Sequence, residues 1–420
     1  MLIEFSVQNF ASIKDKQTLS FVADKSKHLE EHYVIQTNGL RLLKLALIYG
    51  ANASGKTNIL KALDFLRQLV INPLSHKNET IHFQPFLFDE KSRTSPTIFE
   101  IKFSHNANIY SYELCFTNEA ILNEKMVVNK NTIYSRQTDP IKKLAQIKFN
   151  EKIFDDKVIL KILETNTLWN NTVLGGYLKT NTSIAYLEGA IEWFSGHLEG
   201  LLLSSFLENF IHYHIYSGEI DKAILLDILK KADFGIDDIF IRELVASYIS
   251  DDEQAPKYIN DLTIEEREKL VPIFEVYFVH KISKNKHEKL PFQLESKGTQ
   301  RFYELAGILT LLIKKSFIFP IDEIEASLHP DLLEHFLLMF LLNTKNSQII
   351  ATTHYREFLE NTDIFRNDVI WFVQKDENLA TELYSLADFD KRTFNKKTNI
   401  LQSYKVGRLG AIPNLKGRYI

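Results

Sequence analysis

Residues 50–57 constrain the chain more than any other stretch, because they fit the phosphate-binding pattern G-x-x-x-x-G-K-[ST] without a mismatch. Such a loop works only between a strand and a helix. Residues 42–49 form an apolar run of the length of a buried strand, and apolar residues recur at helical spacing from 59 to 70. The sequence therefore predicts a strand, a phosphate-binding loop and a helix, in that order.

The residues of this loop indicate its chemistry. Glycines let the backbone curl, so that successive N–H groups and the helix N-terminus face phosphate oxygens. The candidate nucleotide-binding residues are Gly50, Asn52, Ala53, Ser54, Gly55, Lys56 and Thr57. We expect Lys56 to reach the β and γ phosphates of ATP and the Thr57 hydroxyl to bind Mg²⁺. The alternative is a glycine-rich turn that only caps a helix.

A second stretch, residues 316–323, is an apolar strand that ends in the adjacent acids Asp322 and Glu323. Beside a phosphate-binding loop, the first acid of such a pair holds Mg²⁺, directly or through water. The second carboxylate accepts a proton from the attacking water or orients it. We therefore expect Asp322 to bind the metal and Glu323 to be catalytic, and the alternative is an ordinary strand end with solvated acids.

Two further stretches are candidates for phosphate contacts. Residues 295–300 form a small, hydroxyl-bearing loop that opens an apolar helix, and the candidates there are Ser296, Gly298 and Thr299. A simple helix cap explains this loop equally well. His354 follows the apolar strand 348–353, and a residue at the carboxyl end of such a strand lies on the edge where ligands bind. A lone histidine is more often structural, but this position favours contact with the γ phosphate.

Composition limits the classes of function. A net charge of -4 and a pI near 6.4 give no general case for nucleic acid binding, although a local basic patch stays open. The single cysteine, Cys115, excludes an intramolecular disulfide and suits a reducing compartment. The sequence shows neither a signal peptide nor an apolar run long enough to span a bilayer, so a cytoplasmic protein is expected.

The rest of the chain alternates between β-rich and helical blocks. Strands are expected as a hairpin within 1–23, in an antiparallel block over 81–128 that includes 81–88, and at 239–249 and 273–282. Helices are expected within 156–241. Between these blocks, residues 129–150 read as a solvated hairpin or a patch for an acidic partner, with basic residues Lys130, Arg136, Lys142, Lys143 and Lys148. In the helical block, core packing of Trp169, Trp193 and Phe194 is favoured over a partner surface.

These motifs, in this order, resemble the ABC-type ATPases, the superfamily that includes SMC- and RecF-like proteins. The resemblance implies that residues 50–57 are the Walker A motif, that Gln84 is the Q-loop glutamine at the metal, and that residues 296–300 are a divergent signature motif. It implies that Asp322 and Glu323 are Walker B and the catalytic glutamate, that 325–328 is the D-loop, and that His354 is the switch histidine. Lys297 and Thr299 depart from the transporter signature, and Gln84 is assigned from its order and its neighbours Pro85 and Phe86.

The resemblance also implies an architecture. The expected fold is an α/β, P-loop ABC-type ATPase head, in which a mixed sheet with helices adjoins an antiparallel β subdomain and a helical subdomain is inserted. The expected parts are the first half of the head (1–128), the mainly helical insertion (129–270) and the second half of the head (271–420). In ABC ATPases the signature loop completes the ATP site of another protomer. Ser296 and Gly298 of one chain are thus expected at the γ phosphate held by Lys56 of another.

More narrowly, the chain is similar to the AAA15/AAA21 class of bacterial phage-defence and abortive-infection ATPases. The similar stretches are 5–13, 84–86, 232–236, 295–300, 368–375 and 407–413. Relatives of the overcoming-lysogenization-defect type carry a TOPRIM nuclease after the ATPase. The 66 residues that follow His354 (420 minus 354) are too few for that domain. The expectation is an ATPase that forms a homodimer or larger oligomer on binding ATP and controls a separate effector, such as a nuclease or a toxin.

Two other classes of function stay open. One is a RecF-like or SMC-like ATPase that clamps DNA during repair, for which DNA-stimulated and salt-sensitive ATPase activity is expected. The other is a nucleotide-dependent scaffold that binds ATP with little turnover. Glu323 and His354 favour hydrolysis over the scaffold, and the mild acidity weighs against the DNA clamp.

Overall fold

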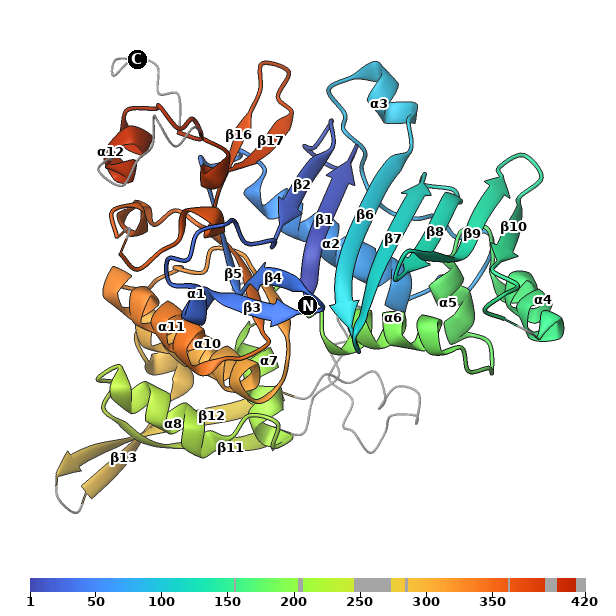
Figure 1. The fold of residues 1–420 in the computed structure, drawn as a ribbon. Helices are drawn as coiled ribbons and strands as arrows, with labels where there is room; N and C mark the ends of the chain where they lie inside the picture. The colour runs from blue at the N-terminus through green and yellow to red at the C-terminus, as the bar shows by residue number, and fades with distance from the viewer. Residues whose placement is uncertain are drawn as a thin grey trace, which may run out of the picture. The chain divides into compact units, whose positions relative to one another are not determined.

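The computed structural model describes residues 1–154, 156–202, 207–244, 273–283, 286–361, 363–389 and 399–412. The chain divides into two compact units, which are described separately below (Figure 1). The first unit comprises Met1–Leu202, Ser316–Ile324 and Lys345–Ile420, and the second comprises Leu203–Lys315 and Glu325–Thr344. The segments 316–324 and 345–420 thus return to the first unit after the chain has built most of the second.

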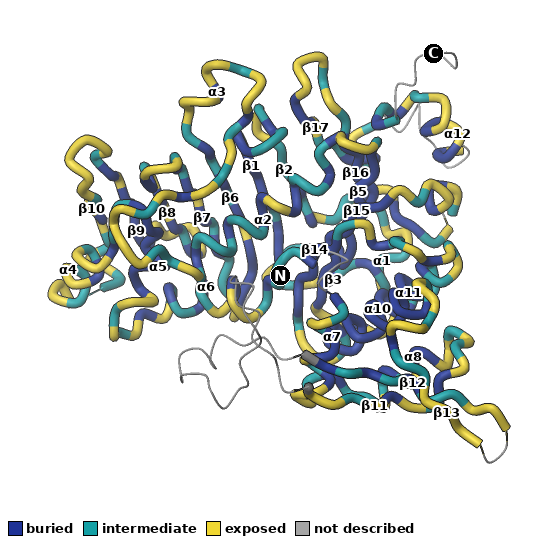
Figure 2. Tube along the Cα trace, turned by 180° about the vertical axis from the view of Figure 1, so that it is seen from behind, coloured by how far each residue is buried: buried dark blue, intermediate teal, exposed yellow. Residues whose placement is uncertain are grey.

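A five-stranded mixed sheet lies at the centre of the first unit. Its order is β14 (Ile318–Ile321), β15 (Gln348–Thr353), β5 (Leu45–Gly50), β16 (Ile370–Lys375) and β17 (Thr381–Ser385). The first four strands are parallel, and β17 returns antiparallel to β16. Every residue of β5, β14 and β15 is buried (Figure 2), which explains the continuous apolar sequences of β5 and β14.

The second sheet of this unit is antiparallel and has the order β10-β9-β8-β7-β6-β1-β2. Its strands are β1 (Leu2–Gln8), β2 (Gln17–Ser20), β6 (Thr97–His105), β7 (Asn108–Phe116), β8 (Ile121–Val128), β9 (Asn131–Asp139) and β10 (Leu144–Phe149). Buried and exposed residues alternate along β6 to β9, as expected for strands with one face on the core. The predicted hairpin within residues 1–23 is present as β1 and β2.

Helices α2 (Lys56–Ile71), α5 (Val173–Leu178) and α6 (Ala185–Gly196) lie along one face of the antiparallel sheet (Figure 1). Trp193 and Phe194 of α6 are fully buried, and the Trp193 ring stacks on that of Phe103 with centroids 4.0 Å apart. The core-packing interpretation of these two residues is confirmed. Trp169 is partly exposed, and the Lys143 ammonium lies 5.2 Å from the centre of its ring.

Short elements complete the first unit: α1 (Glu30–Tyr33), β3 (Val34–Thr37), β4 (Leu40–Leu43), α3 (Glu90–Thr94), α4 (Lys157–Asn166), α12 (Ile400–Lys405) and the 3₁₀ turns η3 (Arg356–Leu359), η4 (Asn367–Val369) and η5 (Leu386–Asp388). β9 and β10 extend the antiparallel sheet beyond residue 129, where the sequence places a boundary between domains. Residues 129–202 belong to the first unit.

In its described residues, the second unit packs four α-helices with a three-stranded antiparallel sheet. The helices are α7 (Leu207–Tyr216), α8 (Lys222–Lys231), α10 (Lys297–Lys314) and α11 (Pro330–Asn343), and the sheet consists of β11 (Ile236–Leu244), β12 (Ile273–Ser283) and β13 (Lys286–Pro291), with the 3₁₀ turn η2 (Phe292–Leu294) before α10. The strands expected at 239–249 and 273–282 correspond to β11 and β12, and residues 245–249 lie outside the described residues. In the described part of the chain, no helix combines the length and apolar content needed to cross a membrane.

The prediction of a strand at 81–88 is wrong, because this segment has no regular secondary structure. Its backbone groups form hydrogen bonds outside any sheet. The Ile81 N–H donates to the Asn118 carbonyl, and the Asn118 side chain donates to the Ile81 carbonyl. The Asn9 side chain accepts from the Phe86 N–H at 3.0 Å. Pro85 also lacks the N–H that a ladder requires. The alternating apolar residues therefore pack in an irregular segment held by two asparagines.

The expectation that the basic residues of 129–150 all face water is wrong for Arg136. The four lysines are exposed, but Arg136 is only 3% exposed and donates to the carboxylate of Glu124, which is 2% exposed. Arg136 also donates to the carbonyls of Leu168, Trp169 and Asn171, and Glu124 accepts from Tyr112 and Tyr134. Burial raises the pKa of Glu124 and lowers that of Arg136, while the opposite charge of each partner opposes these shifts.

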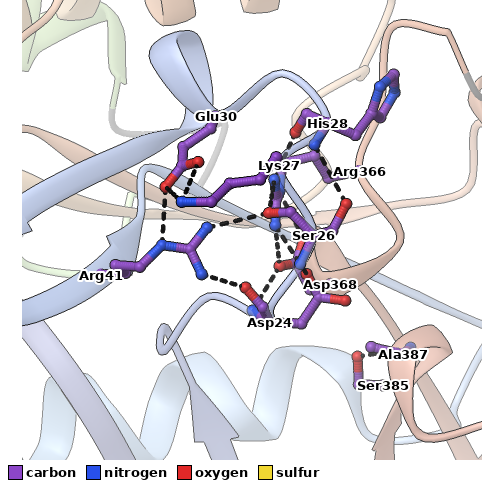
Figure 3. Close-up of polar contacts among 10 residues, drawn as sticks. All are labelled: Asp24, Ser26, Lys27, His28, Glu30, Arg41, Arg366, Asp368, Ser385 and Ala387. Atoms are coloured by element: carbon purple, nitrogen blue, oxygen red, sulfur yellow. Dashed lines mark hydrogen bonds and ion pairs between the residues drawn. The ribbon is translucent and has the colours of Figure 1, made fainter.

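A second buried cation, Arg366, connects residues 24–28, which precede α1, with Asp368, which precedes β16 (Figure 3). The Arg366 guanidinium binds the Asp368 carboxylate through two hydrogen bonds of 2.9 and 2.6 Å and donates to Asp24 at 3.0 Å. It also donates to the carbonyls of Ser26 and His28. This planar cation therefore connects two segments more than 300 residues apart in the sequence.

Candidate functional site

Three neighbouring parallel strands end at one edge of the mixed sheet and bring three of the predicted motifs together. β5 leads into residues 50–57, β14 is followed by Asp322 and Glu323, and β15 is followed by His354. β15 lies between the other two strands, with Ile350 opposite both Pro320 and Ala46. Because the carboxyl ends of parallel strands meet at one edge of a sheet, all three motifs share that edge.

The loop 50–57 has the backbone of a phosphate-binding turn. Ala53 and Gly55 have positive φ angles of 61° and 108°, and Gly55 is the N-cap of α2. A side chain at Gly50 would overlap the carbonyl of Val373, so only glycine fits there. Asn52 and Ala53 are exposed, which leaves the outer side of the loop accessible. The N-terminus of a 16-residue helix therefore opens at an accessible loop, as anion binding requires.

The Lys56 ammonium folds back over this loop. It donates to the carbonyls of Gly50 at 2.9 Å and Ala51 at 3.1 Å, and Lys56 is only 6% exposed. Its positive charge thus lies at the start of the loop. A phosphate group is a stronger partner for an ammonium than a carbonyl, because its hydrogen bonds are charge-assisted.

Thr57 and Asp322 are in direct contact across the sheet edge. The Thr57 hydroxyl lies 3.1 and 3.0 Å from the two carboxylate oxygens of Asp322. A hydroxyl and a carboxylate are hard oxygen ligands of the type that Mg²⁺ prefers, and Mg²⁺ takes its remaining ligands from water and substrate phosphates. Among the described residues, no group of three His, Cys, Asp or Glu side chains is suitable for a metal. Thr57 and Asp322 would supply two of the oxygen ligands of an Mg²⁺ ion whose other ligands are water and phosphate.

Thr352 organises the acid pair, and the sequence analysis missed it. Its hydroxyl donates to Asp322 Oδ1 at 2.6 Å and accepts from the backbone N–H of Glu323 at 2.8 Å. Glu323 has a positive φ of 47°, which is uncommon outside glycine and places an exposed carboxylate just beyond the strand. The position of Thr352, two residues before His354 on the neighbouring strand, was a signal that could have identified it.

His354 and Gln84 lie in the same unit as the loop 50–57. His354 is exposed at the end of β15. Gln84 is also exposed, and its backbone carbonyl accepts from the Ala11 N–H at 2.8 Å, next to Ser12, whose hydroxyl accepts from Asn58 of α2. The roles of His354 at the γ phosphate and of Gln84 at the metal stay predictions.

Ser296, Gly298 and Thr299 belong to the second unit, at the start of α10. Ser296 is the N-cap of this helix, and its hydroxyl accepts from the Thr299 N–H at 3.0 Å. A side chain at Gly298 would come within 3.2 Å of the Ser327 carbonyl, so the predicted signature loop packs closely on the predicted D-loop. Ser296 and Lys297 are exposed. Within its own unit, this loop therefore presents a capped helix N-terminus to solvent.

The helix that follows this loop carries a buried ion pair. Arg301 donates to the Glu304 carboxylate at 3.2 Å, and both residues are buried. Burial raises the pKa of Glu304 from 4.5 to about 7, although the Arg301 charge acts in the opposite direction. The Glu304 carboxyl group on α10 thus gains or loses its proton near neutral pH.

The fold and this sheet edge define the class of the protein: a strand, the loop 50–57 and a helix follow one another at the edge of a mostly parallel sheet, which is the arrangement of a P-loop protein. A family model described as "AAA domain, putative AbiEii toxin, Type IV TA system" matches residues 45–156 and 200–360, and the chain belongs to this family. The family-level resemblance drawn from the sequence is therefore confirmed.

Comparison with solved structures finds heads of SMC proteins. An SMC head bound to the C-winged helix domain of ScpA has a TM-score of 0.45 at 13% identity, over 91% of this chain and 97% of that chain. The SMC head domain from Thermotoga maritima has a TM-score of 0.42 at 13% identity, over 91% and 98% of the two chains. An SMC head with an extended coiled coil, bound to the C-terminal domain of ScpA from Pyrococcus furiosus, has a TM-score of 0.40 at 14% identity, over 96% and 99%. No curated protein sequence matches the chain.

Proposed function

We propose that the protein binds ATP with Mg²⁺ at the edge formed by β5, β14 and β15 and hydrolyses it. The observation that carries this proposal is the meeting of Thr57 with Asp322 at 3.0 and 3.1 Å, beside the loop that contains Lys56. These residues are more than 260 positions apart in the sequence, and their meeting assembles a phosphate cradle, a cation and a pair of metal ligands.

The residues of this edge divide the work of hydrolysis among them. The loop N–H groups and the Lys56 ammonium bind the phosphates and stabilise the negative charge that develops on them. Thr57 and Asp322 hold Mg²⁺, which when bound neutralises phosphate charge. Glu323, fixed by the bond from its N–H to Thr352, orients the attacking water and accepts its proton. His354 contacts the γ phosphate from the neighbouring strand end.

Hydrolysis is proposed to occur between two copies of the chain. The exposed residues Ser296 and Lys297 and the capped N-terminus of α10 support this step, because they present an anion-binding surface to solvent. In the proposed assembly, Ser296, Gly298 and Thr299 of one copy contact the ATP held by Lys56 of the other. The family is described as a putative AbiEii toxin of a type IV toxin–antitoxin system. The proposed role of this chain is in anti-phage defence, where it controls a separate effector.

Measurement of molecular mass with and without ATP tests this proposal. Glu323→Gln should bind ATP without hydrolysing it, so light scattering should show at least a doubling of mass when ATP and Mg²⁺ are added. Lys56→Ala, which loses the phosphate contact, should stay at its original mass. Ser296→Arg should bind nucleotide and also stay at that mass. An unchanged mass for nucleotide-bound Glu323→Gln would contradict the assembly.

A further inference from the structure

A chain of hydrogen bonds between side chains supports the phosphate-binding loop from behind. Thr381, the first residue of β17, is 1% exposed and donates from its hydroxyl to the carbonyl of Ser54 at 2.9 Å. The hydroxyls of Ser12 and Thr381 lie 2.7 Å apart. Asn58 of α2 donates from its amide to the Ser12 hydroxyl at 2.7 Å. Four segments of the first unit therefore meet at one point under the loop.

The direction of each bond in this chain is fixed. A carbonyl oxygen only accepts, so the single hydroxyl proton of Thr381 belongs to the bond with Ser54. Ser12 must then donate its own proton to Thr381, and it accepts from the Asn58 amide. Neither hydroxyl can rotate without losing a bond, and the loss is costly at Thr381, which is 1% exposed. The Ser54 carbonyl is therefore held in one orientation.

The fit around this chain is tight. A side chain at Gly55 would overlap the hydroxyls of both Thr381 and Ser12. The backbone of Thr381 is also fixed, because its N–H donates to the Ser12 carbonyl at 2.8 Å. Two residues further along β17, the Leu383 N–H donates to the Gln17 side chain at 2.7 Å. Hydrogen bonds to Ser12 and Gln17 thus fix the start of β17, and this strand places the Thr381 hydroxyl against the loop.

We propose that Thr381 is a positioning residue for nucleotide binding, acting through the Ser54 carbonyl and oriented by Ser12 and Asn58. It keeps the loop 50–57 in the shape in which its N–H groups converge on the phosphates of a nucleoside triphosphate or diphosphate. This inference rests on the proposed function of the loop. Without the Thr381 hydroxyl, the loop spends less time in the competent shape, and the apparent affinity falls in proportion to that fraction.

Binding of MgADP, measured by calorimetry, tests this role with two variants of one residue. Thr381→Val keeps the shape of the side chain and removes the hydroxyl, and we expect about tenfold weaker binding, in line with the loss of a buried hydrogen bond. Thr381→Ser keeps the hydroxyl and should bind within about twofold of the wild type. In steady-state hydrolysis, Thr381→Val should raise KM for ATP while kcat changes less than about twofold, because bound nucleotide restores the loop.

Thr18→Val is the matched control. It breaks a similar pair, since the hydroxyls of Thr18 on β2 and Ser6 on β1 lie 2.8 Å apart, away from the chain of bonds that reaches Ser54. Its affinity for MgADP should equal that of the wild type. If Thr381→Val does not fold, Ser12→Ala replaces it, and the same KM effect with unchanged kcat is expected. Equal affinity of a folded Thr381→Val and the wild type, or a fall in kcat alone, would overturn the inference.

The outcomes also separate this inference from the proposed function. A wild-type protein that binds neither MgADP nor MgATP would overturn both. A wild type that binds and hydrolyses ATP, with a Thr381→Val variant of equal KM, would overturn the positioning role and leave the proposed function standing.

Discussion

The buried pair of Glu124 and Arg136 and the sheet edge around Asp322 use charge in opposite ways. Glu124 and Arg136 are almost fully buried, and the carboxylate accepts a hydrogen bond from the guanidinium. Asp322 is partly exposed, and its carboxylate accepts from the neutral hydroxyls of Thr57 and Thr352. A charge that is neutralised by its partner contributes to structure, whereas a charge held by neutral groups stays available for a ligand.

Lys56 contacts neutral groups of the same kind. Its ammonium donates to the carbonyls of Gly50 at 2.9 Å and Ala51 at 3.1 Å. Arg366, by contrast, binds two carboxylates. We infer that changes at Glu124, Arg136 or Arg366 act mainly on stability and that changes at Lys56, Asp322 or Glu323 act mainly on nucleotide chemistry.

The largest effect is expected for Glu323→Gln. Removal of the carboxylate that accepts a proton from water should lower kcat for ATP hydrolysis by about 100- to 10,000-fold, while nucleotide affinity changes little. Phosphate release measured at saturating ATP checks this. Glu377→Gln, at an exposed position in the turn between β16 and β17, is the control and should keep wild-type activity. Near-normal turnover in Glu323→Gln would remove Glu323 from the mechanism.

Arg136→Met should have the next largest effect, on stability alone. It leaves the Glu124 carboxylate buried without its cation, and such a loss costs about 3–5 kcal/mol of unfolding free energy. The double variant Glu124→Gln with Arg136→Met removes the stranded charge and should recover part of that loss. Urea unfolding measures both values. A large change in MgADP affinity of the folded Arg136→Met variant would contradict the separation of structural and functional charge.

Alanine substitutions at two glycines with positive φ angles separate the cost of backbone strain from the cost of overlap with neighbours. Gly39 has a φ of 74°, and no atom lies within 4 Å of the carbon that Gly39→Ala would add, so about 1 kcal/mol of stability should be lost. Gly55 has a φ of 108°, and the carbon that Gly55→Ala would add would overlap the hydroxyls of Thr381 and Ser12. This variant should lose roughly 2–3 kcal/mol and bind MgADP more than about tenfold less tightly. Equal losses in thermal unfolding for the two variants would argue against the close fit beneath the loop.

The smallest effect is a pH dependence that comes from Glu304. Its pKa in the folded protein is about 7, above the ordinary value of 4.5, so the folded state holds the proton more tightly than the unfolded state does. The resulting stability is present below about pH 4.5 and is lost as the pH rises to 7. Between pH 5 and pH 8 the wild type should lose on the order of 2 kcal/mol more than Glu304→Gln. Parallel unfolding curves of the two proteins at both pH values would show that Glu304 titrates normally.

The sequence predicted those parts of the site that are local. The loop 50–57 and the acid pair at 322–323 are each recognisable within eight residues, and the apolar runs before them predicted buried strands that the structure contains. Both strands lie in the mixed sheet that the resemblance implied.

Contacts between distant segments escaped the sequence analysis. Thr381 bonds to Ser54 across 327 positions, and threonine is so common in strands that nothing marked it. Apolar and polar residues alternate in the segment 81–88 as in a strand, but its backbone groups form hydrogen bonds with Asn9 and Asn118 from other parts of the unit. Arg136 lies among exposed lysines, and only the fold shows that it meets Glu124.

Calorimetric titration of MgATP into Glu323→Gln and into the double variant Lys56→Ala with Glu323→Gln tests the central claim most directly. The account predicts binding to the first protein and a loss of about 10- to 100-fold in the second, because a charge-assisted contact with phosphate is removed. Equal affinities, or no binding to folded Glu323→Gln, would contradict the assignment of residues 50–57 as the nucleotide site.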